Sequence, residues 1–254
     1  MNYASIAHFY DLLHATLGED RDFLLRRAAE RSGPILELGS GTGRLLLPLA
    51  EAGYTVFGLD NDGEMLAIAN QKRLASTTDV RERLTLIEAD ARKFSLEERF
   101  GLIAVMHNTF MHFDRQDRRR VLTQARRHLL PDGRLFIDVA NPNEVVANTA
   151  EHVLQLERNE LLDDTGERLL QFSTATLDAQ EQVLRVTWIF DVSPVEGGTI
   201  RRFTAQTDYH LLYAHELELQ LDETGFELVE LLGDYHAVAY EEYSPRLIVV
   251  ARLQ

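Results

Sequence analysis

The chain has 254 residues, enough for one large α/β domain with its own hydrophobic core. Its formal net charge of −15 argues against sequence-independent binding to DNA or RNA, because their phosphates would repel it. The absence of cysteine excludes disulfides, thiolate metal sites and cysteine nucleophiles. The sequence shows neither a signal-peptide pattern nor an apolar run of about 18 residues, so we expect a cytoplasmic protein with no membrane partner.

The first half of the sequence alternates between helical and strand patterns, and glycines separate several of them. Strands separated by helices indicate βαβ units, and therefore a parallel sheet that is covered on both faces. The elements that we expect here are helices at residues 3–17, 19–31, 44–52, 63–73 and 114–130, and strands at 35–38, 55–60, 84–88, 102–106 and, after a turn at 131–133, 134–139.

The pattern then changes to alternating, β-rich runs. Three of them, at residues 170–177, 183–192 and 200–209, are separated by segments that suit hairpin loops. We interpret them as an antiparallel meander inserted before the end of the core, which resumes with a helix at 214–223 and strands at 227–232 and 247–252.

The predicted fold is therefore α/β: a Rossmann-like, seven-stranded, mostly parallel sheet with helices on both faces, plus an inserted antiparallel β meander. We assign residues 1–140 and 210–254 to the core, and residues 141–209 to an inserted lid or acceptor subdomain.

The most informative motif is the glycine-rich turn that follows the first expected strand. Gly39, Gly41 and Gly43 let the backbone turn tightly and leave room for a ligand beside it. Asp60 ends the next strand, where an acid can accept both hydroxyls of a ribose. A nicotinamide dehydrogenase shares these features, but its G-x-G-x-x-G fingerprint would place the third glycine at the position of Arg44.

The spacing G-x-G-x-G, with Glu37 two residues before the first glycine, resembles the first motif of the class I S-adenosylmethionine-dependent methyltransferases. Residues 58–66, 88–91 and 129–135 resemble further motifs of that family, in the same order. The β-rich insertion resembles, in layout, a subgroup of small-molecule and sugar-amine N-methyltransferases that place a β-lid over the active site. Asp132 replaces a glycine that is common in the family, a change that a type I turn tolerates.

The resemblance implies that S-adenosyl-L-methionine is the cofactor. In the family, the acids matching Glu37, Asp60 and Asp90 serve the methionine moiety, the ribose and the adenine amino group, and a residue matching Met65 often covers the adenine. Glu37 could instead be a solvated strand end, and Met65 could be core filler. The full set of cofactor-binding residues that we expect is Glu37, Gly39, Ser40, Gly41, Gly43, Asp60, Asn61, Met65, Asp90, Ala91, Met106 and Asn108.

Three residues are candidates for catalysis: His112, His107 and Tyr10. The two histidines follow the fourth strand, where related enzymes meet the methyl group, and His112 is the better candidate for a base. A structural histidine that caps the next helix is the alternative, as is a packed aromatic side chain for Tyr10. His210, Tyr213 and His215 are further candidates for facing the acceptor or, alternatively, a polar helix start. We expect no metal site.

These features together predict an enzyme, an S-adenosylmethionine-dependent methyltransferase acting on a nitrogen or oxygen of a small molecule. The alternatives are a catalytically silent S-adenosylmethionine-binding module or, less favoured by the glycine spacing, the dehydrogenase. We expect a monomer or homodimer with no nucleic-acid partner, since the arginine clusters at 118–120 and 126–127 are typical of a solvated helix face.

Overall fold

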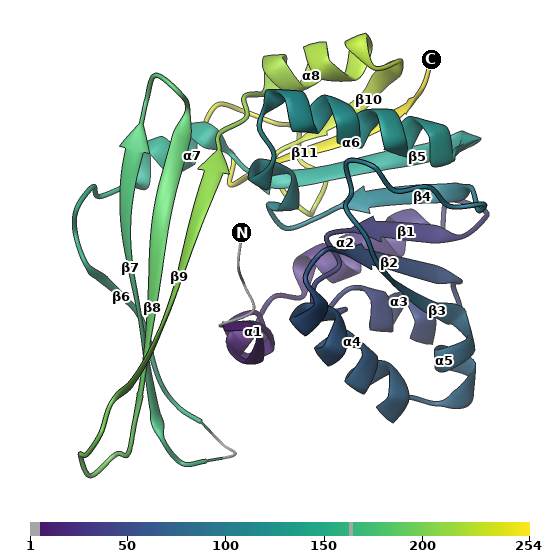
Figure 1. Ribbon diagram of the computed structural model, residues 1–254. Helices are drawn as coiled ribbons and strands as arrows, with labels where there is room; N and C mark the ends of the chain where they lie inside the picture. The colour runs from purple at the N-terminus through teal and green to yellow at the C-terminus, as the bar shows by residue number, and fades with distance from the viewer. Residues whose placement is uncertain (1–5, 163–164) are drawn as a thin grey trace.

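The computed structural model describes residues 6–162 and 165–254, so the expected helical residues 3–5 lie outside the described part. The chain forms two separate sheets (Figure 1). The larger has seven strands in the order β10-β11-β5-β4-β1-β2-β3, and the smaller has four in the order β6-β7-β8-β9.

The larger sheet is mostly parallel, as the sequence predicts. Strands β3, β2, β1, β4 and β5 run parallel, whereas β11 pairs antiparallel with both β5 and β10. Its strands are β1 (Ile35–Leu38), β2 (Val56–Asp60), β3 (Leu84–Glu88), β4 (Phe100–Val105), β5 (Leu129–Ala140), β10 (Phe226–Leu232) and β11 (Arg246–Leu253).

Helices cover both faces of this sheet, because neighbouring residues of each strand point to opposite sides. Leu36 and Leu38 of β1 belong to one apolar cluster with α6 and α8, whereas Ile35 belongs to a second cluster with α2, α3 and α5. The helices are α1 (Ala7–Leu13), α2 (Glu19–Ala28), α3 (Leu46–Glu51), α4 (Gly63–Ala75), α5 (Thr78–Arg83), α6 (Arg115–His128), α7 (Pro142–Asn148) and α8 (Ala214–Glu223), with a 3₁₀ turn, η2, at Thr109–His112.

Two expectations about the first half need correction. The first helix ends at Leu13 rather than at residue 17. The expected turn at residues 131–133 lies inside β5, where the pairing moves from Phe100 opposite Leu129 to Leu102 opposite Arg134. The proline and glycine of this segment therefore mark an irregularity within a continuous strand.

The smaller sheet is antiparallel throughout and contains the expected meander. Three of its strands are β7 (Arg168–Asp178), β8 (Val183–Ser193) and β9 (Arg201–His210). The fourth, β6 (Gln155–Leu161), was not expected, since most of its residues are exposed and leave no alternating apolar pattern. The short helices α5 and α7 were likewise not expected.

The N-terminal helix connects the two sheets. Ile6 and Phe9 pack against the apolar row of Leu169, Phe190 and Val192 on the smaller sheet. Figure 1 shows α1 between that sheet and the larger one. In the part of the chain that the structure describes, no helix is both long and apolar enough to cross a bilayer.

A buried arginine also connects the larger-sheet part of the chain with the end of the smaller sheet. The Arg118 guanidinium of α6 is 3% exposed and donates hydrogen bonds to the carbonyls of Phe110, in η2, and His210, at the end of β9. Burial lowers its pKa to about 10, so the side chain stays protonated at neutral pH. Its positive charge strengthens both hydrogen bonds.

We expect Arg118→Met to lower the free energy of unfolding by about 1.5–3 kcal/mol, because two buried carbonyls lose a charged donor. The matched control is Arg119→Met on the same helix, where the side chain is 52% exposed and 3.6 Å from Glu223. That change should stay within about 0.5 kcal/mol. Urea unfolding of both variants measures the difference, and equal losses would contradict the proposed link.

Candidate active site

The glycine-rich turn after β1 adopts the conformation that its sequence predicts. Gly39, Gly41 and Gly43 all have positive φ angles, of 76°, 53° and 74°. A Cβ atom on Gly41 would have no protein atom within 4 Å, so this position opens onto free space. A Cβ on Gly43 would instead approach Leu47 and Ala69, which shows that this glycine permits the close packing of two helices.

Asp60, at the end of β2, faces this turn. Its carboxylate accepts hydrogen bonds from the backbone N–H of Gly41, at 2.7 Å, and of Asp62, at 2.9 Å. Burial raises the pKa of Asp60, and the two backbone donors oppose that rise. The carboxylate is thus fixed at the carboxyl end of the sheet, beside the open position at Gly41.

A second carboxylate follows β3. Asp90 accepts hydrogen bonds from Arg92, whose guanidinium also contacts Asp117 at 2.7 Å. The Arg92 guanidinium holds the pKa of Asp90 below its usual range. Asp90 therefore stays ionised, with its orientation set by an arginine that the sequence analysis did not single out.

The segment after β4 has an unusual backbone. His107 and Asn108 have φ angles of 50° and 68°, the left-handed region that non-glycine residues rarely adopt. The Asp138 carboxylate compensates, because it accepts hydrogen bonds from the His107 N–H and the Tyr235 hydroxyl, both at 2.9 Å, and from Arg246 at 2.8 Å. Arg246 also donates to the side-chain oxygen of Asn108 at 3.1 Å.

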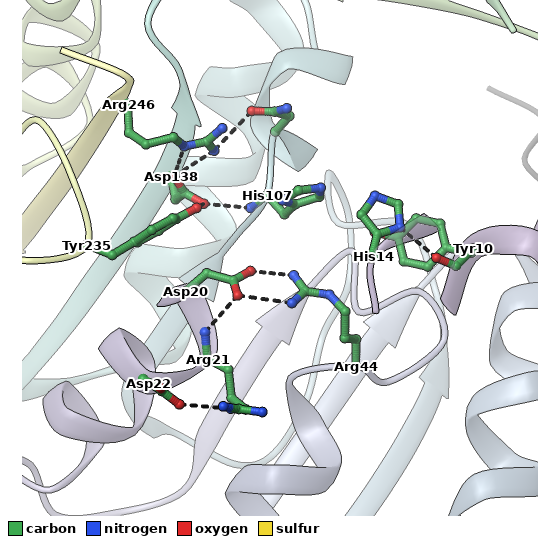
Figure 2. Close-up of polar contacts among 11 residues, drawn as sticks. Tyr10, His14, Asp20, Arg21, Asp22, Arg44, His107, Asp138, Tyr235 and Arg246 are labelled. Carbon is green, nitrogen blue, oxygen red and sulfur yellow. Dashed lines mark hydrogen bonds and ion pairs between the residues drawn. The ribbon is translucent and has the colours of Figure 1, made fainter. Parts of the chain in front are cut away.

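Figure 2 shows this network together with a second ion pair, between Asp20 and Arg44, that lies below it. The His107 ring lies edge-to-face against the ring of His14, with 4.9 Å between their centroids. Burial lowers the pKa of His107 to about 4 and also lowers the pKa of His14, so both rings are neutral at pH 7.

The glycine-rich turn, the carboxyl ends of β2 and β3, and the segment after β4 border one cavity of about 730 Å³. It extends from the carboxyl edge of the larger sheet to the inner face of the smaller one. The expected site residues that line it are Tyr10, Gly39, Gly41, Asp60, Asn61, Met65, Asp90, Ala91, His107, Asn108 and His112.

The other expected residues lie outside the lining. Ser40 and Met106 are 5% and 2% exposed, and Met106 packs in the core behind the sheet edge. Glu37 is also buried, with one carboxyl oxygen that has no hydrogen-bond partner, and burial raises its pKa to about 8. Gly43 packs helices, as described above. The further candidates for facing the acceptor, His210, Tyr213 and His215, also lie outside the lining.

Sequence reasoning missed the far wall of the cavity. That wall comes from the smaller sheet and carries Arg158, Gln171, Trp188, Phe190 and Tyr209. These residues lie on β6 to β9, on the face that points inward, which only the strand register reveals. The described residues contain no group of three or more His, Asp or Glu side chains that could hold a metal ion.

Comparison with known proteins places this geometry in a family. A model of the methyltransferase domain matches residues 35–133, from β1 into β5. The chain is 26% identical to the cypemycin N-terminal methyltransferase of a Streptomyces species, over 96% of this chain and 94% of that one. It is 31% identical to the dTDP-3-amino-3,6-dideoxy-alpha-D-glucopyranose N,N-dimethyltransferase of Streptomyces fradiae, over 58% of this chain and 60% of that one.

The structure of the CcbJ methyltransferase from Streptomyces caelestis superimposes with a TM-score of 0.80 at 26% identity, covering 94% of this chain and 98% of that one. Together with the methyltransferase domain at residues 35–133, these relatives identify the chain as an S-adenosylmethionine-dependent methyltransferase. This similarity includes the smaller sheet, since it covers nearly the whole chain. The dehydrogenase and the silent binding module receive no support from these relatives.

The methyltransferase offers a cavity that fits its cofactor, S-adenosylmethionine. The position beside Gly41 is open, and the carboxyl groups of Asp60 and Asp90 border the same space. A ribose offers two hydroxyl donors and an adenine offers an amino donor, which carboxylate oxygens accept.

We expect Asp60→Ala to weaken S-adenosylmethionine binding by about 1.5–3 kcal/mol, because charge-assisted hydrogen bonds are lost. The matched control is Glu88→Ala, since Glu88 lies opposite Asp60 in the register of β2 and β3 but does not line the cavity. Isothermal titration calorimetry measures both affinities. Unchanged binding in Asp60→Ala, or equal losses in both variants, would remove Asp60 from the cofactor site.

Proposed function

We propose that the methyltransferase transfers a methyl group to an amine nitrogen of a small molecule bound between its two sheets. The observation that carries this proposal is the shared cavity, whose one end presents Asp60 and Asp90 and whose other end is the inner face of the smaller sheet. Residues 141–209 then act as an acceptor lid, and residues 1–140 and 210–254 as the cofactor-binding core.

The acceptor end favours a group that donates hydrogen bonds. Gln171 is 7% exposed, and its buried side-chain oxygen has no hydrogen-bond partner among residues 6–162 and 165–254. The Arg158 guanidinium forms an ion pair with the Glu160 carboxylate, with 3.0 Å between nitrogen and oxygen. Glu157, on the same strand, adds a second carboxylate to the lining. Aromatic side chains, Trp188 and Tyr209 among them, complete the wall and offer apolar contact area to the acceptor.

The two relatives described above support nitrogen as the acceptor atom. One is named for the N-terminus of cypemycin and the other for N,N-dimethylation of an amino sugar. Both names place the methyl group on a nitrogen. We therefore propose the amine, rather than either substrate, as the feature that this chain recognises.

In the proposed mechanism, the chain contributes binding, orientation and exclusion of water. Asp60 holds the ribose, Asp90 and Ala91 border the adenine with Met65 and Asn61, and Gly39 and Gly41 leave room for the cofactor. S-adenosylmethionine supplies a methyl group on a sulfonium, which needs no further activation. Tyr10 closes the cavity from α1, and Gln171 orients the amine.

His107 and His112 are proposed to act as neutral polar walls. Burial lowers the pKa of His112 to about 3, and its ring stacks on that of Tyr209 with 5.1 Å between centroids. An imidazole with so low a pKa is a weak base at neutral pH. The amine therefore has to enter in its unprotonated form, and its proton leaves after transfer.

We also propose that the methyltransferase works in the cytoplasm as a monomer or homodimer, without nucleic acid. The net charge of −15 supports the last point, because phosphate backbones carry the same sign.

The proposed function predicts methylation of amines but not of matched alcohols. The panel pairs benzylamine with benzyl alcohol and adds glucosamine, glycine and a short peptide, with S-adenosylhomocysteine release and mass spectrometry as readouts.

Gln171→Leu should lower kcat/KM about 10-fold or more, since a hydrogen bond to the amine is lost. Gln206→Leu is the control, because Gln206 is exposed on the same sheet. Methylation of hydroxyls alone, or of no panel member, would contradict the proposal.

The lowered histidine pKa values predict the pH dependence of the reaction. We expect kcat/KM to rise with pH through the pKa of the acceptor amine, because only the neutral amine reacts and burial holds the pKa values of His107 and His112 at about 4 and about 3. Two acceptors of different amine pKa should therefore give different midpoints. His112→Gln should keep each midpoint and cost less than about 10-fold, whereas loss of a true general base costs about 10²–10⁴-fold. A midpoint near 6.5 that disappears in His112→Gln would restore His112 as the base.

A further inference from the structure

A second cavity of about 250 Å³ lies behind the acceptor wall, between α7 and the inner face of the smaller sheet. We infer that this second cavity binds an apolar substituent of the methyl acceptor, an alkyl chain or an unsubstituted ring. The inference deepens the proposed function and rests on it, because it assumes an acceptor whose amine lies in the main cavity.

The walls of the second cavity are mainly apolar. Met111, Leu184 and Val186 are 2%, 8% and 6% exposed, and Val145 and Ala175 complete the lining from α7 and β7. Apolar cavities take up apolar molecules, and one of roughly 150 Å³ accommodates benzene. The second cavity therefore offers room for a ring or a chain of several carbons.

Three polar side chains that line the second cavity already have partners. Asn148 donates to the Glu144 carbonyl at 2.9 Å, and Thr149 donates to the Val145 carbonyl at 2.6 Å. Ser173 donates to Glu157 at 2.5 Å. Because these groups are satisfied within the protein, a polar ligand would gain little here and would lose its hydration.

Three residues line both cavities: Asn108, Trp188 and Tyr209. Asn108 is held rigidly, because its side-chain oxygen accepts hydrogen bonds from the Ala140 N–H at 2.7 Å and from Arg246. The two cavities thus meet at a fixed wall that carries two large aromatic rings. A substituent attached to the amine would pass these rings, and their faces favour an apolar segment over a charged one.

Trp188 lies in this wall and is the chain's single tryptophan, so its fluorescence can report binding there. The experiment titrates n-alkylamines, from ethylamine to octylamine, into the enzyme saturated with S-adenosylhomocysteine and follows the fluorescence of Trp188. We expect Kd to fall about fourfold per added methylene, the equivalent of ~0.8 kcal/mol per buried CH₂, until the second cavity is full. Beyond that length Kd should level off.

Filling the second cavity should abolish this dependence on chain length. Ala175→Phe introduces an aromatic ring from β7, and Val145→Phe introduces one from α7, so that either variant can be used if the other fails to fold. Thr176→Phe is the matched control, since neighbouring residues of a strand point to opposite faces and Thr176 does not line the second cavity. The control should keep the wild-type series, and all three should keep the wild-type affinity for S-adenosylmethionine.

A flat series in the wild type, an absence of any alkylamine binding, or an unchanged gradient in the folded Phe variants would overturn the inference. These outcomes differ from failure of the proposed function, which would appear as alkylamines that bind with the expected gradient while no amine is methylated.

Discussion

The architecture of the site depends on one buried carboxylate, that of Asp138. The side chain is fully buried, and a buried carboxylate is tolerated only when charge and hydrogen bonds compensate its lost hydration. Here the compensation comes from Arg246 of β11, from Tyr235, and from the backbone of His107. The same interactions hold residues 107 and 108 in a left-handed conformation that would otherwise be unfavourable. The antiparallel end of the sheet thereby fixes the loop at its parallel centre.

This loop determines how the space above the sheet is divided. Asn108 borders both cavities, and His107 contacts His14 at the end of the N-terminal helix region. The chain is strongly acidic, yet the histidines and the carboxyl of Glu37 are held neutral by burial around pH 7. Asp60 and Asp90 line the cavity on the side of the larger sheet, and Glu157 and Arg158 line it on the side of the smaller sheet.

The two ends come from different parts of the fold, and few contacts join them. Phe9 packs on the smaller sheet, Arg118 reaches the end of β9, and Arg158 of β6 donates to the Leu13 carbonyl of α1. These contacts place the smaller sheet over the carboxyl edge of the larger one. In the proposed function the inward side chains of β7 to β9 face the acceptor, so they can change with it while Asp60 and Asp90 are retained.

The sequence by itself determined the seven-stranded sheet, the antiparallel meander and the positions of Gly41, Asp60 and Asp90 near the ends of β1, β2 and β3. Apolar strands, glycines at the first turn and acids at strand ends are local signals, and Gly41, Asp60 and Asp90 lie where those signals predict. Tertiary structure alone decided the rest. Strand β6 has no apolar alternation because it is an exposed edge, and the turn signal at 131–133 became an irregularity inside β5. Gln171 and Trp188 meet the cavity through strand register, and Asp138 finds Arg246 across 108 residues. Such contacts leave no local pattern, because their partners are close only after the chain has folded.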